Sequence, residues 1–258
     1  MQYNAIVKNI KDITPEIKLF FIQFKDGHKF QYKAGQFAVL GLPDDKNNLD
    51  GEWHRRAYSI TSAPSQDDVE FYIVLVKEGK LTPRLFNLKV GDEIFMGEKA
   101  AGLMNFNDVE DDANLLFIST GTGIAPFVSM IREHKEEIFN GKRQVALIHG
   151  ARYTYELGFK GELEELAKKS PYFHYYPIVS RSEQEVGVEW TGHKGHAQSL
   201  IANGIIEKDF GTKITPDNFK VFLCGNPRMV DETVEMFTEK GFTRNTLKEK
   251  GNLYFDKH

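Results

Sequence analysis

The chain has 258 residues, of which 41% are hydrophobic and 27% are charged. This length exceeds the usual span of one domain, about 100–150 residues, and the apolar content excludes disorder as the main state. We therefore expect two compact domains, and one large barrel is the alternative. The formal net charge is -4 and no tract of Lys or Arg stands out, which argues against a general nucleic-acid-binding protein.

The sequence contains one cysteine, Cys224. A single cysteine excludes an intramolecular disulfide, a four-cysteine iron–sulfur cluster and a structural zinc site, so we predict no metal site in this chain. The N-terminal residues lack the apolar run of a signal peptide, and no window is long and apolar enough to cross a bilayer. We therefore expect a soluble cytoplasmic protein.

Residues 1–106 consist of short β-favouring segments separated by Gly, Pro, Asp and Asn. We predict six strands: Ala5–Ile10, Ile17–Phe24, Gln36–Leu42, Arg56–Thr61, Val69–Val76 and Glu93–Met96. This number suits a small antiparallel six-stranded β-barrel.

The pattern changes near residue 108, where the acidic stretch Asp108–Asn114 is suited to a linker. Buried strands are predicted at Leu115–Ile118, Val145–His149, His174–Val179 and Phe219–Cys224. Helices are predicted between and after them, at Ala125–Glu137, Lys160–Lys168, His196–Asn203 and Met229–Lys240. This alternation predicts an α/β domain with a doubly wound parallel sheet, whose ligands collect at the carboxyl ends of the strands.

A glycine-containing segment, Ser119–Pro126, follows the first of these strands and leads into a helix. Two glycines one residue apart allow a tight turn, and free N–H groups at the start of a helix can bind a phosphate. The segment lacks the Walker lysine and the third glycine of the usual dinucleotide motif. An ordinary strand-to-helix turn explains it equally well.

Arg152 and Arg181 each follow a predicted parallel strand. A guanidinium at this edge could bind a phosphate through two hydrogen bonds. A surface ion pair is the simpler explanation for either arginine alone, whereas two at corresponding places favour a binding site.

Cys224, Gly225 and Asn226 follow the last predicted strand. The glycine removes a side chain where a flat ring could approach, and the cysteine would border that space. A lone buried cysteine is more often a small core residue than a reagent.

In the first domain, the segment Arg55–Ile60 combines charges with a strand pattern. By strand periodicity Arg56 and Tyr58 share one face and Ser59 points to the other. A cation beside an aromatic ring suits a phosphate joined to an aromatic ligand. A charged edge strand that resists aggregation is the alternative.

Together these segments resemble the ferredoxin–NADP reductase family, specifically its bacterial flavodoxin/ferredoxin reductases. The resemblance runs the length of the chain and is carried by Arg56–Ser59, Gly79–Leu85, Lys89–Glu93, Ala100–Gly102, Ser119–Pro126, His149–Tyr153, Val179–Arg181 and Cys224–Met229. It implies an FAD-binding β-barrel domain over residues 1–106 and an NADP(H)-binding α/β domain over residues 107–258.

The resemblance also implies which residues hold FAD. Arg56 would bind the pyrophosphate, Tyr58 would lie against the isoalloxazine, and Ser59 would be a catalytic residue near flavin N5. The other FAD-binding residues implied are Ala57, Tyr72, Ile73, Val74, Lys80, Leu81, Thr82 and Thr122.

For the nicotinamide dinucleotide, Arg181 is the residue implied for the 2'-phosphate, and Cys224 would border the nicotinamide as a further catalytic residue. The remaining NADP-binding residues implied are Ala151, Arg152, Ser180, His193, Gly225 and Asn226.

Two departures from the family pattern stand out. Where many bacterial relatives place a second arginine for the 2'-phosphate, this chain has His193, followed by Lys194. Family members also end with an aromatic residue stacked on the flavin. The register of the C-terminus puts His258 there with Asp256 beside it, as catalytic residues, and Tyr254 or Phe255 is the alternative.

The function implied is that of an FAD-dependent reductase, which transfers hydride between NADP(H) and flavin N5 and passes single electrons to or from a ferredoxin or flavodoxin. We expect a monomer. The alternatives are the reductase component of an oxygenase, a reductase of free flavin, and a non-enzymatic flavin-binding subunit.

Overall fold

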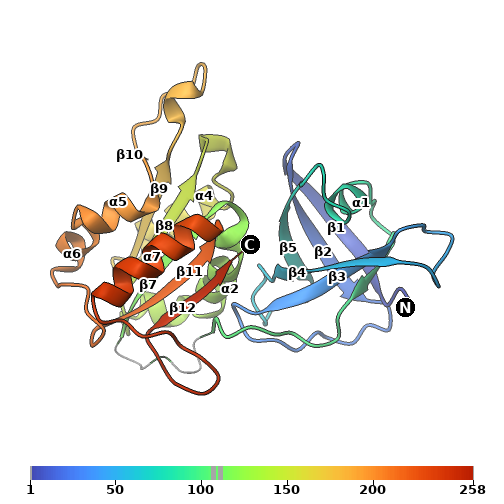
Figure 1. Cartoon of the computed structure of the whole chain (residues 1–258), viewed down its shortest axis with the longest axis horizontal. Helices are drawn as coiled ribbons and strands as arrows, with labels where there is room; N and C mark the ends of the chain where they lie inside the picture. The colour runs from blue at the N-terminus through green and yellow to red at the C-terminus, as the bar shows by residue number, and fades with distance from the viewer. Residues whose placement is uncertain (1, 106–108, 110–112, 258) are drawn as a thin grey trace. The chain divides into compact units, whose positions relative to one another are not determined.

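A computed structural model describes residues 2–105, 109 and 113–257, which form two compact units (Figure 1). Unit 1 comprises Met1–Asn105 and Ala125–Glu133, and unit 2 comprises Phe106–Ile124 and His134–His258. The predicted linker, residues 108–114, lies largely outside the described residues. Among the described residues, no helix has the length and hydropathy that crossing a bilayer requires.

Unit 1 is built on a six-stranded antiparallel sheet. Its strands are β1 (Ala5–Thr14), β2 (Ile17–Phe24), β3 (Phe37–Pro43), β4 (Trp53–Ser59), β5 (Val69–Val74) and β6 (Glu93–Met96), in the order β4-β3-β6-β1-β2-β5. An antiparallel bridge between Ile60 and Phe71 joins the two outer strands, which closes the sheet into a barrel. The six strands and the antiparallel barrel are confirmed.

The barrel interior is filled by apolar side chains that alternate along the strands. On β2 the side chains of Phe20 and Ile22 point inward, and on β5 those of Phe71 and Ile73 do so, each at most 1% exposed. The short helix α1 (Thr82–Phe86) adds Leu85 to the same core.

The helix that follows the glycine-containing segment belongs to unit 1. The prediction of one helix over Ala125–Glu137 is wrong, because α2 (Ala125–Glu133) ends at His134 and a separate helix, α3 (Lys135–Phe139), lies in unit 2. Seven consecutive residues of α2, residues 125–131, are buried. Polar contacts fix the helix to the barrel: Arg132 pairs with the buried Glu70 at 3.0 Å, and the Ser129 hydroxyl donates to the carbonyl of Ser62.

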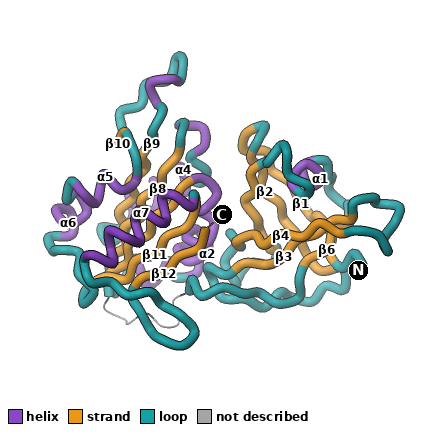
Figure 2. Tube along the Cα trace, in the orientation of Figure 1, coloured by secondary structure: helices purple, strands orange, loops and turns teal. Residues whose placement is uncertain are grey.

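Unit 2 contains a six-stranded parallel sheet, seen as one layer of strands in Figure 2. Its strands are β7 (Asn114–Thr120), β8 (Val145–Ala151), β9 (Phe173–Val179), β10 (His193–Lys194), β11 (Phe219–Gly225) and β12 (Leu253–Lys257), in the order β10-β9-β8-β7-β11-β12. The chain runs outward from β7 to β10 and then returns to place β11 on the other side of β7. The strand order therefore reverses between β7 and β11, which is where open parallel sheets bind ligands.

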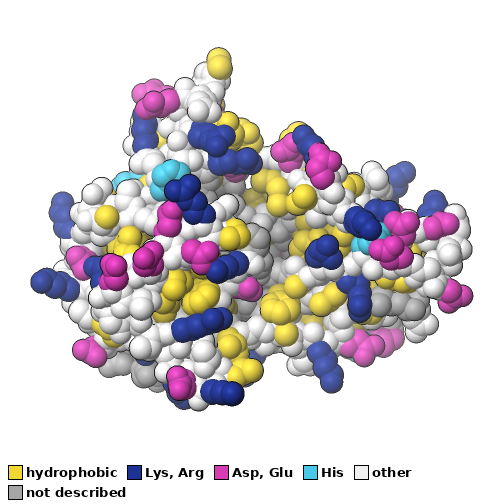
Figure 3. All heavy atoms as spheres, in the orientation of Figure 1, with side chains coloured by type: hydrophobic (Ala, Val, Ile, Leu, Met, Phe, Trp, Pro, Cys, Tyr) yellow, Lys and Arg dark blue, Asp and Glu magenta, His cyan; other side chains and the backbone are white. Residues whose placement is uncertain are grey.

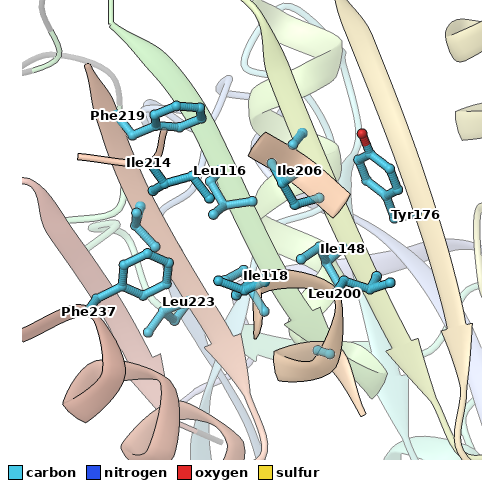
Figure 4. Close-up of a cluster of buried hydrophobic side chains, with 14 of the residues drawn as sticks. Leu116, Ile118, Ile148, Tyr176, Leu200, Ile206, Ile214, Phe219, Leu223 and Phe237 are labelled. Atoms are coloured by element: carbon cyan, nitrogen blue, oxygen red, sulfur yellow. The ribbon is translucent and has the colours of Figure 1, made fainter. Parts of the chain in front are cut away.

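Helices cover both faces of this sheet. The helices α5 (Ala197–Ala202), α6 (Ile205–Phe210) and α7 (Pro227–Glu239) pack on one face, and α4 (Lys160–Lys169) packs against β9. The core shown in Figure 4 brings Leu116 and Ile118 of β7 together with Leu200 of α5 and Phe237 of α7. The predicted doubly wound parallel sheet is confirmed.

The sequence did not predict α1, α6, β10 or β12. The helix α6 is separated from α5 by Gly204, whose φ of +66° breaks the helix. The strand β10 has two residues, and β12 is defined by its pairing with β11 rather than by a long apolar run.

Candidate functional site

Strand β4 carries the predicted residues Arg56, Ala57, Tyr58 and Ser59. Arg56 and Ala57 are exposed, whereas Tyr58 and Ser59 are half-buried, and the ring of Tyr58 packs against the barrel core. Burial raises the pKa of Tyr58 to about 12, and the positive charge of Arg56 opposes this shift. The phenol therefore stays neutral at physiological pH and lies within the electrostatic reach of a cation, as the shared strand face predicts.

On β5 the three predicted residues differ in orientation. Ile73 is 1% exposed and its side chain belongs to the barrel core, so its backbone is the part that a cofactor could contact. Strand alternation places Tyr72 and Val74 on the opposite face of β5. Tyr72 is buried and Val74 is partly exposed.

Lys80, Leu81 and Thr82 form the turn that leads into α1. The Thr82 hydroxyl donates to the carbonyl of Val76 and accepts from its N–H, and Leu81 is buried, so these two side chains shape the turn. Lys80 is exposed, and its nearest carboxylate, Glu52, lies at 3.5 Å. A ligand at this turn would therefore meet backbone N–H groups and the Lys80 ammonium.

In unit 2 the two glycine-containing segments contact each other at the point where the strand order reverses. A Cβ on Gly123 would lie 2.2 Å from the carbonyl oxygen of Cys224, and one on Gly225 would lie 2.4 Å from Oγ1 of Thr120. The same Thr120 hydroxyl accepts a hydrogen bond from the Asn226 N–H at 2.9 Å. Both glycines are thus required for the close approach of two backbone segments.

This contact corrects the explanation of Gly225. The sequence predicts that a flat ring approaches where Gly225 lacks a side chain, but Thr120 fills the space beside Gly225. The φ of Gly225 is +136°, a backbone conformation that other residues rarely adopt. Thr122, on the 3-10 turn η2 (Gly121–Ile124), is partly exposed, as a ligand contact requires.

Cys224 is fully buried near the end of β11. Burial raises the pKa of its thiol, and the charge of Asp256, its register partner on β12, acts in the same direction. The thiol is therefore protonated at neutral pH and is a poor nucleophile. Asn226 is exposed, and its side chain accepts from the N–H of Arg228 at the start of α7.

Cys224 in the folded protein should react with a thiol reagent roughly 100-fold more slowly than in the unfolded chain, because reaction requires local opening. The rate should rise with pH for the folded and the unfolded chain alike, because the thiolate is the form that reacts. Following one equivalent of an aromatic disulfide reagent by absorbance checks this, with the urea-unfolded chain as control. Rapid labelling of the folded protein would contradict the described burial.

Arg152 lies directly after β8 and is held by a buried carboxylate. Its Nη2 is 2.6 Å from Oε1 of Glu156, and its own N–H donates to Oε2 of Glu156 at 3.0 Å. The side-chain hydrogen bond to Glu156 raises the pKa of Arg152 and fixes the orientation of its guanidinium. The guanidinium is still largely exposed, so Glu156 positions it and leaves it able to contact a ligand.

Backbone hydrogen bonds bring the two predicted arginine segments together. The Ser180 N–H donates to the carbonyl of Ala151 at 3.0 Å, and the Arg181 N–H donates to that of Arg152 at 2.8 Å. Arg181 is exposed, and no ion-pair partner for its guanidinium exists among the described residues. The four residues predicted at this edge are therefore neighbours, and the Arg181 guanidinium is available to a ligand.

His193 and Lys194 form β10, which pairs with the end of β9. The ring of His193 lies 6.2 Å from that of Tyr176, while the Lys194 ammonium is 3.4 Å from Glu183, in the turn that follows Arg181. Adjacent strand residues face opposite sides, so only one of the two can approach this turn. Figure 3 shows basic and acidic side chains close together near the ends of β8, β9 and β10.

The C-terminal strand β12 settles part of the predicted stacking arrangement. Tyr254 is 2% exposed and its ring stacks on Phe222 at 4.3 Å, so this alternative to His258 is wrong: the ring is inside unit 2. The Phe255 ring is covered by the Arg244 guanidinium at 4.4 Å. Asp256 is partly exposed, and His258 lies outside the described residues.

Three residues that contact the predicted site residues were missed by sequence reasoning: Thr120, Glu156 and Glu183. Glu156 follows Arg152 by four residues, a spacing that signals an ion pair. Thr120 and Glu183 act through contacts with distant segments, for which the sequence holds no signal. Among the described residues, His, Cys, Asp and Glu side chains form no group of three or more that could hold a metal ion.

Comparison with known proteins matches both units to oxidoreductase domains. The family described as "Oxidoreductase FAD-binding domain" matches residues 4–99, and "Oxidoreductase NAD-binding domain" matches residues 117–235. The first match covers the barrel strands with Arg56 and Tyr58. The second covers most of β7 and the strands β8 to β11, with Arg152 and Arg181.

Similar proteins over most of the chain carry related names. A flavodoxin/ferredoxin–NADP reductase of Buchnera aphidicola is 33% identical over 234 residues, which is 88% of each chain. A ferredoxin–NADP reductase of Azotobacter vinelandii is 33% identical over 227 residues, 84% of this chain and 83% of its own. The crystal structure of a ferredoxin NADP+ reductase from Neisseria gonorrhoeae with bound FAD and NADP superposes with a TM-score of 0.84 at 28% identity, covering 98% of this chain and 97% of that one. The chain belongs to the ferredoxin/flavodoxin–NADP reductase family, and it is an oxidoreductase with an FAD-binding and an NAD-binding domain.

Proposed function

We propose that this protein is a ferredoxin/flavodoxin–NADP+ reductase, which moves hydride between NADP(H) and N5 of FAD and exchanges single electrons with a ferredoxin or a flavodoxin. The names of the Buchnera and Azotobacter relatives support the reaction and the partner class. The Neisseria structure, with bound FAD and NADP, supports the two cofactors.

The residues of β4 and of the turn before α1 fit FAD. Arg56 offers an exposed guanidinium for a pyrophosphate, and Tyr58 offers a neutral ring anchored against the barrel. The Lys80 ammonium and the backbone at the start of α1 suit a second phosphate contact. These groups bind and orient, and we assign the remaining positions of unit 1, Ala57, Tyr72 and Val74, to shaping the same site. Thr122, in unit 2, stays a predicted FAD contact.

The observation that carries the NADP(H) assignment is the pair of backbone hydrogen bonds that joins Arg152 to Arg181. These bonds hold the backbones of the two arginine segments beside each other at the carboxyl ends of β8 and β9, and Glu156 orients the Arg152 guanidinium. Guanidinium groups bind phosphate through paired hydrogen bonds, so the arrangement suits the phosphates of a dinucleotide. Ala151 and Ser180 supply the carbonyl and N–H that hold the two segments together.

When bound, FAD supplies the two-electron and one-electron chemistry, and the protein supplies orientation and electrostatics. Ser59 follows Tyr58 in β4, and its side chain faces the opposite side of the strand. We assign to its hydroxyl a hydrogen bond at flavin N5. We assign to Cys224 a positioning role: its thiol is buried and protonated, and its backbone carbonyl lies close to Gly123.

Stopped-flow reduction of the purified flavoprotein tests the proposed function. Fast bleaching of the flavin by NADPH, with much slower bleaching by NADH, is the expected result. Electron transfer from the reduced enzyme to a ferredoxin or flavodoxin is then followed at the carrier's own absorption band. Absence of bound flavin, or faster reduction by NADH, would overturn the assignment.

Replacing Arg181 by alanine should raise KM for NADPH about 10–100-fold, because a charge-assisted contact to phosphate contributes about 1.5–3 kcal/mol. KM for NADH should change less than about twofold, since NADH lacks the 2'-phosphate. The matched control is Lys168→Ala, which removes an exposed cation of α4 that pairs only with Glu165 among the described residues. Equal losses with both nucleotides would show that Arg181 acts on the fold rather than on the phosphate.

A further inference from the structure

An acidic side chain lies within the cationic edge that we assign to NADP(H). Glu183 belongs to the 3-10 turn η4 (Ser182–Gln184), whose first flanking residue is Arg181. Its carboxylate is 3.4 Å from the Lys194 ammonium, and its side chain is 82% exposed. A carboxylate at this place is unexpected in a site that must hold an anion.

The strand register places the ion pair of Glu183 and Lys194 at the same end of the sheet as Arg152 and Arg181. Val179 of β9 pairs with Ala151 of β8 on one side and with Lys194 of β10 on the other. Arg152 follows Ala151, and Arg181 follows Val179 by two residues. The three cations therefore come from the ends of three adjacent strands.

The carboxylates near this edge differ in how firmly their partners hold them. Glu156 is buried and committed to Arg152, and Glu185 is held by the N–H and hydroxyl of Thr154, each at 2.8 Å. Glu183 instead has an exposed ammonium as its ion-pair partner among the described residues. Exposed pairs contribute about 0–1 kcal/mol, so a phosphate can replace Glu183 as the partner of Lys194.

His193 does not compete for this role. Its ring approaches Tyr176, whose hydroxyl donates to Asp209 on α6, and Tyr176 belongs to the core on the face that α5, α6 and α7 cover. Lys194, the next residue along the strand, points to the other face and reaches the turn after Arg181.

We propose that Lys194 is the second cation for the 2'-phosphate beside Arg181, and that Glu183 competes with the phosphate for it. This inference rests on the proposed NADP(H) site. Free of nucleotide, Glu183 neutralises Lys194; with NADPH present, the phosphate displaces the carboxylate, and the cost of that displacement lowers affinity for NADPH but leaves NADH unaffected. Glu183 thereby sets how strongly the enzyme discriminates between the two nucleotides.

The test uses the holoenzyme and measures binding as well as turnover. Glu183→Gln should tighten binding of adenosine 2',5'-bisphosphate, measured by calorimetry, about two- to fivefold, and lower KM for NADPH by the same factor. Binding of 5'-AMP and KM for NADH should be unchanged. The gain should shrink in high salt, because the charges involved are exposed.

Two further variants make the test specific. Lys194→Met should weaken binding of the bisphosphate, and Glu183→Gln should give no gain when combined with it, because the carboxylate acts through the lysine. Glu189→Gln, an exposed carboxylate in the same connecting segment, is the matched control and should change nothing.

The outcomes separate this inference from the proposed function. If Glu183→Gln behaves like Glu189→Gln while the wild-type enzyme still prefers NADPH, the role of Glu183 is wrong and the reductase assignment stands. If Lys194→Met weakens 5'-AMP and the bisphosphate equally, Lys194 is not a 2'-phosphate ligand. If the wild-type enzyme does not bind the bisphosphate at all, the NADP(H) assignment itself fails.

Discussion

Replacing Gly123 by alanine should lower kcat/KM for NADPH roughly 100-fold and destabilise the fold by about 1–3 kcal/mol. The added methyl would lie 2.2 Å from the Cys224 carbonyl oxygen and 2.7 Å from the Gly225 Cα. Backbone atoms on both sides cannot rotate away, so the turn after β7 and the end of β11 must separate. Any group that these two segments orient is then displaced.

Two control variants distinguish close packing from a general intolerance of alanine. A Cβ on Gly161, in α4, would meet nothing within 4 Å, so Gly161→Ala should be neutral or slightly stabilising. Gly121 has equally open surroundings but a φ of +56°, so its alanine variant should lose only about 1 kcal/mol. Urea unfolding, flavin content and steady-state kinetics measure all three. A Gly123→Ala enzyme with normal kinetics would mean that the two segments can move apart freely.

Replacing Arg132 by methionine should destabilise unit 1 by about 3–5 kcal/mol, because it removes a cation that pairs with a buried carboxylate. Glu70 is 6% exposed and Arg132 20%, at 3.0 Å. The same guanidinium donates to the carbonyl of Thr61 at 3.3 Å, so its loss affects both β5 and the end of β4. Urea unfolding followed by far-UV circular dichroism gives the change in free energy.

The control for this second prediction is an ion pair at the surface. Lys77 pairs with Glu16 at 2.7 Å, with both side chains more than half exposed, so Lys77→Met should cost less than about 1 kcal/mol. Adding Glu70→Gln to Arg132→Met should restore part of the lost stability, since an amide is less costly to bury than a carboxylate. Equal effects of Arg132→Met and Lys77→Met would contradict the description of the Glu70 pair as buried.

The barrel and the parallel sheet followed from local sequence patterns. In β2 apolar residues alternate along the strand because its inward face must be apolar, and turn residues mark both ends. The positions of Arg152 and Arg181 followed from a rule about parallel sheets rather than from any motif. Such predictions succeed when burial and chain direction alone decide the outcome.

The elements that were missed depend on residues distant in sequence. β10 exists because His193 and Lys194 pair with the end of β9, and β12 exists because it pairs with β11. The end of α2 at Glu133 reflects packing of that helix on the barrel, and the residues of the helix carry no local signal for it. Gly225 was misread for the same reason, because its neighbour Thr120 lies 105 positions earlier in the chain.

The membership of α2 in unit 1 has a consequence for synthesis of the chain. The barrel strands end at Met96, but the helix that covers part of the unit is complete only at Glu133. At about 5–20 residues per second, a ribosome needs roughly 2–7 seconds to add the intervening residues. During this time the barrel surface that α2 later covers is exposed to solvent. A truncated product that ends near residue 105 should therefore aggregate or recruit chaperones instead of folding as an independent domain.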